Sequence, residues 1–194
     1  MADQRSRARA EERRQALIEA AYQSIASHGL GELRTRDIAA QVGITHATLH
    51  HYFPTKEMLI RAVLQYAVQQ RSQVTALAEQ KGDTILERVH RFVASSYQQV
   101  HEDPTLWLVL DEFALRAKQD PAIRDIVLAN YQSLHHYVTA LLAAGLQQGE
   151  LRADLDPESA ATLLIMCVLG MSLVEPILPS SEKLVTQLER WLTS

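Results

Sequence analysis

The sequence has a single cysteine, Cys167, and few residues that interrupt helices, with 7 glycines and 6 prolines among its 194 residues. One cysteine excludes a disulfide within the chain and any metal site built from paired cysteines. Glycine and proline together reach about half their usual share, which favours long helices and few tight turns. The net charge of −4 excludes a uniformly basic protein that would coat nucleic acid or membrane by charge alone.

Long hydrophobic runs are also scarce. The longest uncharged, apolar-rich stretch covers residues 159–174, which is shorter than the roughly 18–20 residues needed to cross a bilayer. Residues 1–12 are polar and rich in arginine, without the apolar core of a secretory signal. Apolar residues nevertheless make up 47% of the chain, enough to bury a sizeable core. We therefore expect a soluble, cytoplasmic protein.

The charge is distributed unevenly along the chain. Residues 1–62 hold 9 Lys and Arg against 7 Asp and Glu, a net charge of +2, together with four of the eight histidines. Residues 63–194 hold 10 Lys and Arg against 16 Asp and Glu, a net charge of −6. A small basic segment joined to a larger acidic one indicates a division of labour.

The apolar periodicity predicts an all-α fold of about nine helices, without a convincing strand or an internal repeat. The first helix is expected from Glu11 to His28, which leaves residues 1–10 as a flexible basic arm. Hydroxyl caps, prolines and glycines predict where helices begin and end. These boundary residues are Thr35, Thr45, Thr55, Pro104, Pro121, Pro157, Gly29, Gly43 and Gly149.

Residues 35–53 carry the most informative pattern, two short helices joined through a glycine, which predicts a helix-turn-helix. Ala39 is small where the two backbones cross, and Gly43 occupies the turn position that requires a positive φ. Four apolar residues are expected to face inward, namely Ile38, Val42, Ile44 and Leu49. The second helix projects polar groups that can reach base edges or phosphates in a major groove. They are His46, Thr48, His50 and His51.

This helix-turn-helix belongs to a longer pattern that extends over residues 14–59. The characteristic stretches are residues 18–21, 28–29, 35–39, 42–45, 48–49 and 52–57. In these stretches the chain resembles the N-terminal domain of the TetR family of transcriptional regulators. The resemblance implies a homodimeric regulator, most often a repressor, that binds a palindromic operator in double-stranded DNA and leaves it when a small-molecule effector binds. We therefore expect a DNA-binding domain over residues 1–54 and a helical ligand-binding and dimerisation domain over residues 55–194.

The resemblance also assigns contacts with the operator. It places Thr35, Thr45 and Lys56 at phosphates, and it places Arg36, His46, Ala47 and Thr48 at or near base edges. Where the family usually has a tyrosine, this chain has His50, followed by His51. A neutral imidazole can donate one hydrogen bond to a phosphate, and a protonated one adds charge. We therefore hypothesise that operator affinity rises as the pH falls toward 6.

An effector pocket is expected in the helical domain. The candidate lining residues are Tyr66, Phe92, Tyr97, Trp107, Asp111, Tyr131, His135 and Met166. Core packing is the default interpretation for Trp107, and for His135 a half-buried packing role is as well supported as a place in the pocket. Next to Asp111, Glu112 is expected to pair with Arg116 at i, i+4.

The segment 163–169 is apolar on nearly every side, so a helix formed by it needs cover on two faces. Together with the apolar stripe of the last helix it predicts a subunit interface, a four-helix bundle with two helices from each chain. Ordinary core packing is the alternative. The predicted interface residues are Leu164, Val168, Met171, Leu184, Leu188 and Trp191.

No metal or cofactor is predicted. Glu87 and His90 have the spacing of a di-iron ligand pair, but the sequence has no second Glu-x-x-His, which such a site requires. The sequence also has no glycine-rich phosphate loop and no Gly-x-Ser-x-Gly motif. A helical-bundle enzyme is therefore a weak alternative. The other alternative is a protein-interaction adaptor whose helix-turn-helix is only structural.

Overall fold

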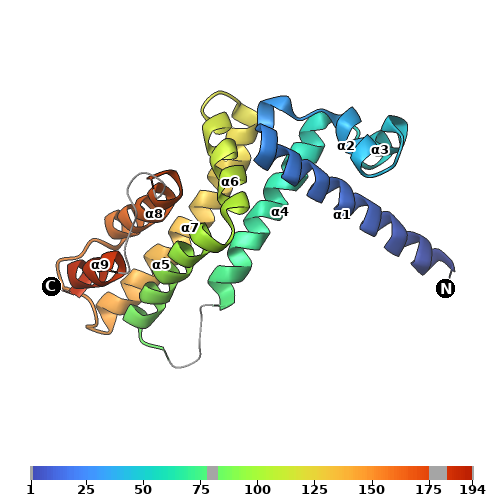
Figure 1. Cartoon of the computed structure of the whole chain (residues 1–194). Coiled ribbons are helices and arrows are strands. Elements are labelled where there is room, and N and C mark those ends of the chain that lie inside the picture. The colour runs from blue at the N-terminus through green and yellow to red at the C-terminus, as the bar shows by residue number, and fades with distance from the viewer. Residues whose placement is uncertain (1, 78–82, 175–182, 194) are drawn as a thin grey trace. The chain divides into compact units, whose positions relative to one another are not determined.

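The computed structural model describes residues 2–77, 83–174 and 183–193, and in these ranges the chain forms α-helices and one short 3-10 helix, with no strand (Figure 1). The all-α fold predicted from the sequence is therefore confirmed. The elements are α1 (Ala2–His28), η1 (Leu30–Glu32), α2 (Thr35–Gln41), α3 (His46–Tyr52), α4 (Lys56–Leu77), α5 (Ile85–Glu102), α6 (Pro104–Ala117), α7 (Pro121–Gln147), α8 (Pro157–Val174) and α9 (Lys183–Thr193).

Local chemistry at the helix ends explains most of these boundaries. Thr45 Oγ1 accepts a hydrogen bond from the Thr48 N–H at 3.1 Å, and Thr55 Oγ1 accepts one from the Met58 N–H at 3.2 Å. Both threonines thus satisfy N–H groups that the first turn of a helix leaves without partners. The predicted glycines Gly29, Gly43 and Gly149 have φ values of +81°, +71° and +72°, a region that residues with a Cβ rarely adopt.

Two boundaries differ from the sequence prediction. Thr35 is the first residue of α2, and Arg34 occupies the N-cap position without a side-chain hydrogen bond. In addition, α1 begins at Ala2 rather than Glu11, so residues 2–10, expected to form a flexible arm, are helical. The extension has a simple physical reason. Alanine, glutamine, arginine and glutamate have high helix propensities, and neither glycine nor proline occurs before Gly29.

The chain divides into two compact units. The first contains residues 1–69 and 108–126, and the second contains residues 70–107 and 127–194. Fully buried side chains fill the core of each unit. In the first unit they include Leu17, Ile25, Leu33, Ile38, Leu49, Leu59, Leu64 and Phe113. In the second unit they include Leu106, Leu142, Leu164 and Leu192.

Helix α8 is, in the described ranges, the one helix long and apolar enough to cross a membrane by length and composition alone. The helix has 18 residues because Pro157 and Glu158, which precede the apolar stretch 159–174, are also helical. In the fold α8 packs against α5, and 33% of it is buried inside the chain. A helix that supplies the core of a water-soluble bundle has the same composition.

Candidate functional site

Helices α2 and α3 form the predicted helix-turn-helix, and they lie together in the structure (Figure 1). The turn between them is closed by two backbone hydrogen bonds, from the Gly43 N–H to the Ala40 carbonyl at 3.0 Å and from the Ile44 N–H to the Ala39 carbonyl at 2.9 Å. Ile38 and Leu49 are buried, as predicted, whereas Val42 and Ile44 are half-buried. The apolar contacts thus fix α3 against α2 while leaving the outer face of α3 open.

The outer face of α3 is polar and carries no carboxylate. The exposed candidates on this face and at its N-cap are Thr45, Ala47, Thr48, His50 and His51, while His46 is half-buried. Arg36 on α2 is exposed, and Lys56 is half-buried as the first residue of α4. The structure therefore groups the candidates for contact with DNA on one short helix and on the elements directly before and after it.

Hydrogen bonds within the chain orient several of these side chains. Thr35 Oγ1 lies 3.0 Å from His46 Nε2, which joins the first residue of α2 to the first residue of α3. The hydroxyls of Thr45 and Thr48 lie 2.8 Å apart. These bonds reduce the number of conformations that the side chains must give up on binding, which is the advantage of a preorganised surface.

The three histidines of α3 differ in their surroundings. His50 Nδ1 lies 3.1 Å from the Pro54 carbonyl oxygen. The His50 ring also meets the His46 ring edge to face, with centroids 4.4 Å apart. His51 instead lies beside Tyr52, with ring centroids 5.6 Å apart. Only His50 is thus held by a backbone carbonyl that can accept a hydrogen bond but cannot donate one.

A carboxylate from far along the chain holds the segment that precedes α2. Glu112 on α6 accepts a hydrogen bond through Oε2 from the Leu30 N–H at 2.9 Å. At Gly29, a Cβ would stand 3.4 Å from the same carboxylate oxygen. The predicted pairing of Glu112 with Arg116 is therefore wrong, because Glu112 binds the backbone of η1, and Arg116 instead lies 3.7 Å from Asp120. No local pattern could reveal a contact between residues 82 positions apart.

Comparison with known proteins identifies the family. Residues 17–63 match the family described as "Bacterial regulatory proteins, tetR family", and residues 86–194 match the family described as "BetI-type transcriptional repressor, C-terminal". The chain belongs to the TetR family of transcriptional regulators. The resemblance drawn from residues 14–59 is thereby confirmed. The similarity also extends over residues 86–194, for which the sequence motifs indicated only the helical architecture.

Individual TetR-family relatives are distant. HTH-type transcriptional regulator BetI of Brucella abortus (strain 2308) is 29% identical over 126 residues, which cover 63% of this chain and 62% of that protein. The chain therefore matches less than two thirds of the length of this relative. A transcriptional regulator from Saccharomonospora viridis, solved in complex with choline, has a TM-score of 0.80 at 24% identity and covers 93% of this chain and 94% of its own. AibR, solved with isovaleryl coenzyme A and operator DNA, has a TM-score of 0.73 at 20% identity and covers 93% of this chain and 97% of its own.

The predicted effector residues of this TetR-family chain fall in both compact units. Tyr66 and Asp111 belong to the first unit, where both are half-buried and the Tyr66 ring meets Tyr22 edge to face. The other six belong to the second unit. Phe92 and Trp107 are buried and Tyr97 is half-buried, whereas Met166 is 62% exposed on the surface of α8.

Tyr131 and His135 lie together in the second unit, in a groove of about 420 Å³ along α7. The groove is lined by Leu128, Tyr131, Gln132, His135, His136, Thr139 and Glu158. Thr162 donates its hydroxyl hydrogen to the Glu158 carbonyl at 3.0 Å, so its oxygen accepts from His135 Nε2 at 3.0 Å. The ring of Tyr131 has a cation nearby, since the Arg71 guanidinium lies 5.8 Å from its centre. Burial lowers the pKa of Arg71, and Tyr131 opposes that shift.

Four buried side-chain polar atoms in the second unit have no hydrogen-bond partner among the described residues. Two belong to Arg91, whose guanidinium forms an ion pair with Asp83, and the others are the indole Nε1 of Trp107 and the hydroxyl oxygen of Thr139. Trp107 is only 2% exposed, and a buried donor without an acceptor costs about 1–3 kcal/mol. Such groups are usually satisfied by ordered water or by a ligand.

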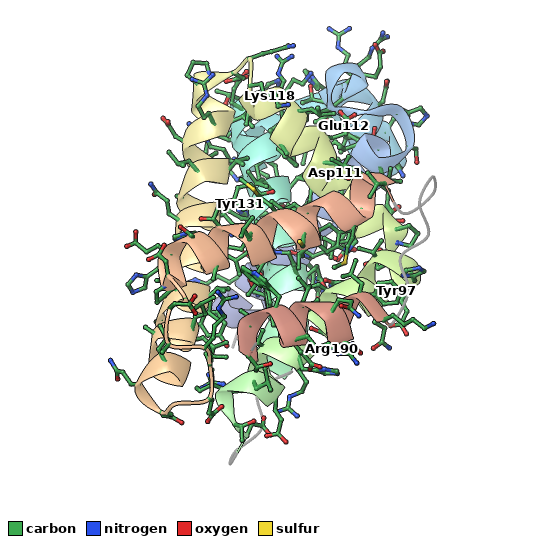
Figure 2. The ribbon with its side chains drawn as sticks, turned by 90° about the vertical axis from the view of Figure 1, so that its left-hand side faces the viewer. Tyr97, Asp111, Glu112, Lys118, Tyr131 and Arg190 are labelled. Atoms are coloured by element: carbon green, nitrogen blue, oxygen red, sulfur yellow. The ribbon has the colours of Figure 1, made fainter. Side chains whose placement is uncertain are left out.

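The predicted subunit interface requires a correction on α8. Leu164, Val168 and Met171 are buried inside their own chain, with 0%, 4% and 4% of their surface exposed. The opposite face of α8 instead exposes Leu163, Met166, Leu173 and Val174, by 43% to 62%. On α9 the predicted residues Leu184, Leu188 and Trp191 are half-buried and follow one helical stripe. Figure 2 shows α8 and α9 on the face turned toward the viewer.

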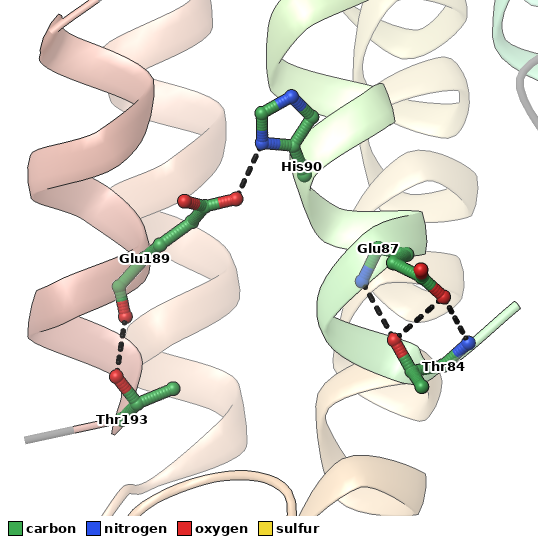
Figure 3. Close-up of polar contacts among 5 residues, drawn as sticks. All are labelled: Thr84, Glu87, His90, Glu189 and Thr193. Carbon is green, nitrogen blue, oxygen red and sulfur yellow. Dashed lines mark hydrogen bonds and ion pairs between the residues drawn. The ribbon is translucent and has the colours of Figure 1, made fainter.

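The residues with di-iron spacing have other partners in the structure (Figure 3). Thr84 and Glu87 form a capping box at the start of α5, with the Thr84 N–H donating to Glu87 Oε2 at 2.8 Å. These hydrogen bonds hold the pKa of Glu87 below its ordinary value. His90 Nδ1 contacts Glu189 Oε1, which ties α5 to α9. Among the described residues, no three His, Cys, Asp or Glu side chains are grouped so that they could hold a metal ion.

Proposed function

We propose that this TetR-family protein is a cytoplasmic transcriptional repressor whose residues 1–54 bind a near-palindromic operator. The observation that carries the proposal is the outer face of α3, which combines exposed hydroxyl and imidazole groups with an absence of carboxylates. Such a short, polar, preorganised helix fits the major groove of DNA. The cations Arg36 and Lys56 lie on the helices that flank α3 in the chain, from which Arg36 can reach base edges and Lys56 a phosphate.

Selection of bound sequences from a pool of random DNA duplexes provides the operator for the test. The Arg36→Ala/Lys56→Ala double variant should then lose most of its affinity. Its dependence on salt should fall by about one unit for each phosphate contact removed. The Arg116→Ala/Lys118→Ala variant is the matched control, because it removes the same charge from exposed sites on and after α6. Equal affinities for the two double variants would favour the protein-interaction adaptor.

We further propose that residues 55–194 form a homodimer through the exposed apolar face of α8 and the half-buried stripe of α9. Soluble proteins rarely leave such a face uncovered. Two helices from each subunit would bury it in a four-helix bundle. Two-fold symmetry would then place the two α3 helices about one helical turn of DNA apart, which explains why a palindrome is expected.

The dimer is tested by placing a charge at the centre of this face. Met166→Glu should dissociate the dimer in sedimentation velocity, because a carboxylate would have to be buried at the interface. Leu115→Glu is the control, since Leu115 is also exposed, by 55%, but lies on α6. Dissociation by the control and not by Met166→Glu would place the interface elsewhere.

The effector that we propose is a small organic cation that releases the operator. Three observations support this class: the BetI-type match over residues 86–194, the similar structure that holds choline, and the buried indole of Trp107. Indole is the side chain that attracts cations most strongly through its ring. A ligand that also carries a hydrogen-bond acceptor would satisfy the Trp107 Nε1 donor, which has no partner among the described residues.

Choline is the first probe. Titrated into the protein–operator complex, it should release the DNA, while 3,3-dimethyl-1-butanol, its uncharged analogue, should have a much smaller effect. Trp107→Phe keeps an aromatic ring but removes the N–H and part of the π surface, so it should weaken the response about tenfold or more. An equal response to the charged and uncharged compounds would reject the cationic class.

A further inference from the structure

We propose that His50 contacts an operator phosphate only as an imidazolium, so that each protomer takes up a proton at His50 when it binds DNA. The inference rests on the proposed function of α3 as the recognition helix. It adds a condition to that function, namely that one phosphate contact depends on a proton.

The geometry of His50 imposes this condition. A backbone carbonyl oxygen only accepts hydrogen bonds, so the 3.1 Å contact between His50 Nδ1 and the Pro54 oxygen requires the hydrogen on Nδ1. A neutral imidazole has one N–H. With that group bound inside the chain, Nε2 of the neutral ring carries a lone pair, and a phosphate oxygen also offers only lone pairs. Nε2 becomes a donor only when the ring is protonated, and it then brings a positive charge as well.

His50 is exposed, so its ring is accessible to DNA. The tyrosine usual at this position of the family has a phenolic hydroxyl, which donates at every pH below about 10. The exchange of tyrosine for histidine therefore changes a constant donor into one that appears as the pH falls. Because the pairing of Nδ1 with Pro54 is local, it does not depend on DNA being present.

The surroundings of His50 limit the number of protons taken up. Its edge-to-face partner His46 has its own Nε2 paired with the Thr35 hydroxyl, which can donate or accept, so the state of His46 is not dictated. Two charged rings with centroids 4.4 Å apart repel each other, so the pair favours one proton over two. On α2, α3 and the first turn of α4, the other charged or titratable groups are Arg36, Asp37, His51, Tyr52, Lys56 and Glu57. From α1, Arg14 lies over the ring of Phe53, the residue that follows α3.

The direct test is calorimetric titration of the selected operator in buffers of different ionisation enthalpy, between pH 6 and pH 8. The wild type should take up about one proton per protomer, and its affinity should rise by up to about tenfold per protomer for each unit that the pH falls. His50→Tyr should bind at pH 8 more tightly than the wild type, with uptake and pH slope largely abolished. Equal proton uptake and equal slope in His50→Tyr and the wild type would overturn the proposal.

Control variants separate this effect from general attraction of protons by DNA. His46→Gln and His51→Gln change neighbouring histidines of α3, and both should still show proton uptake. His101 Nδ1 pairs with the Tyr97 carbonyl at 2.9 Å in the same way as His50 with Pro54, but on α5. His101→Tyr should therefore behave like the wild type. Loss of uptake in His46→Gln or His51→Gln, with retention in His50→Tyr, would assign the proton to another histidine. Failure of both wild type and His50→Tyr to bind any DNA would instead reject the proposed function.

Discussion

Helices α3 and α8 expose opposite kinds of surface, and each keeps its exposed face by a different physical means. Helix α3 has one buried residue, Leu49, and its polar side chains are oriented by hydrogen bonds to Thr35, Thr45 and Pro54. Helix α8 buries six residues and exposes leucine, methionine and valine on its other side. The polar face that we propose for DNA is therefore oriented by hydrogen bonds, whereas the apolar face that we propose for a second subunit is oriented by the packing behind it.

The largest expected effect compares neighbouring leucines of α8. Leu164→Ala should lower the free energy of unfolding by about 2–5 kcal/mol, because it opens a cavity at a fully buried site. Leu163→Ala should change the stability of the monomer by less than about 0.5 kcal/mol, because this side chain is 48% exposed. Urea unfolding, at protein concentrations too low for a dimer to form, measures the free energy of unfolding of both variants. Similar losses in both variants would show that α8 has no distinct inner and outer faces.

The next effect compares two glycines. A Cβ on Gly145 would stand 2.8 Å from both Ile85 Cγ2 and Leu151 Cδ1, so Gly145→Ala should cost about 1–3 kcal/mol through overpacking. At Gly43 no atom lies within 4 Å of the added Cβ, but φ is +71°, so Gly43→Ala should cost about 1–2 kcal/mol through backbone strain. Thermal unfolding measures both losses. Gly43→Asn tells the causes apart, since asparagine tolerates positive φ and should recover part of the stability.

A smaller loss is expected when Glu112 is changed, which tests how the segment before α2 is held. Glu112→Gln keeps the shape and an acceptor oxygen but removes the charge, so it should destabilise the protein by about 0.5–1 kcal/mol. Hydrogen exchange should then speed up at the Leu30 amide, which is the donor to this carboxylate. Glu102→Gln, on the exposed end of α5, is the control. Unchanged exchange at Leu30 in Glu112→Gln would contradict the role of Glu112.

The smallest effect concerns pH and an exposed pair of the second unit. Arg152 donates two hydrogen bonds to Asp154, at 2.7 Å and 2.6 Å, and the pair lowers the pKa of Asp154 from 3.8 to about 2. A lowered folded pKa means that the pair stabilises the fold above the unfolded pKa of about 4, and that this contribution is lost as the pH falls through about 2. A carboxyl NMR titration measures the value. Arg152→Gln should return the pKa of Asp154 toward 3.8, and no change would exclude the pair as the cause.

The sequence predicts the ends and the turn of α2 and α3 better than it predicts the buried face of α8. The reason is the distance along the chain between the residues that are in contact. Thr45 caps α3 through a residue three positions away, and Gly43 makes a turn that depends on its own φ, so both are visible in a short motif. The bond from Thr35 to His46 spans eleven positions, and the bond from Leu30 to Glu112 spans 82. Those contacts depend on how the chain folds back on itself, which no local pattern contains.

The inner face of α8 could not be predicted for a related reason. Residues 163–169 are apolar at every position, so their sequence has no periodicity that separates the core side from the outer side. The predicted residues Leu164, Val168 and Met171 therefore fell on the core side. On α9 charged and apolar residues alternate with helical spacing, and there the predicted stripe of Leu184, Leu188 and Trp191 does reach the surface.

Hydroxyl-radical footprinting on DNA selected by the protein tests the central claim most directly, namely that two α3 helices of a two-fold dimer enter successive major grooves. We predict two protected patches on one face of the duplex, centred about 10 base pairs or slightly more apart and related by the symmetry of the selected sequence. Met166→Glu should weaken both patches together. A single patch, or protection without regard to sequence by wild-type protein freed of bound ligand, would show that two α3 helices do not bind successive major grooves.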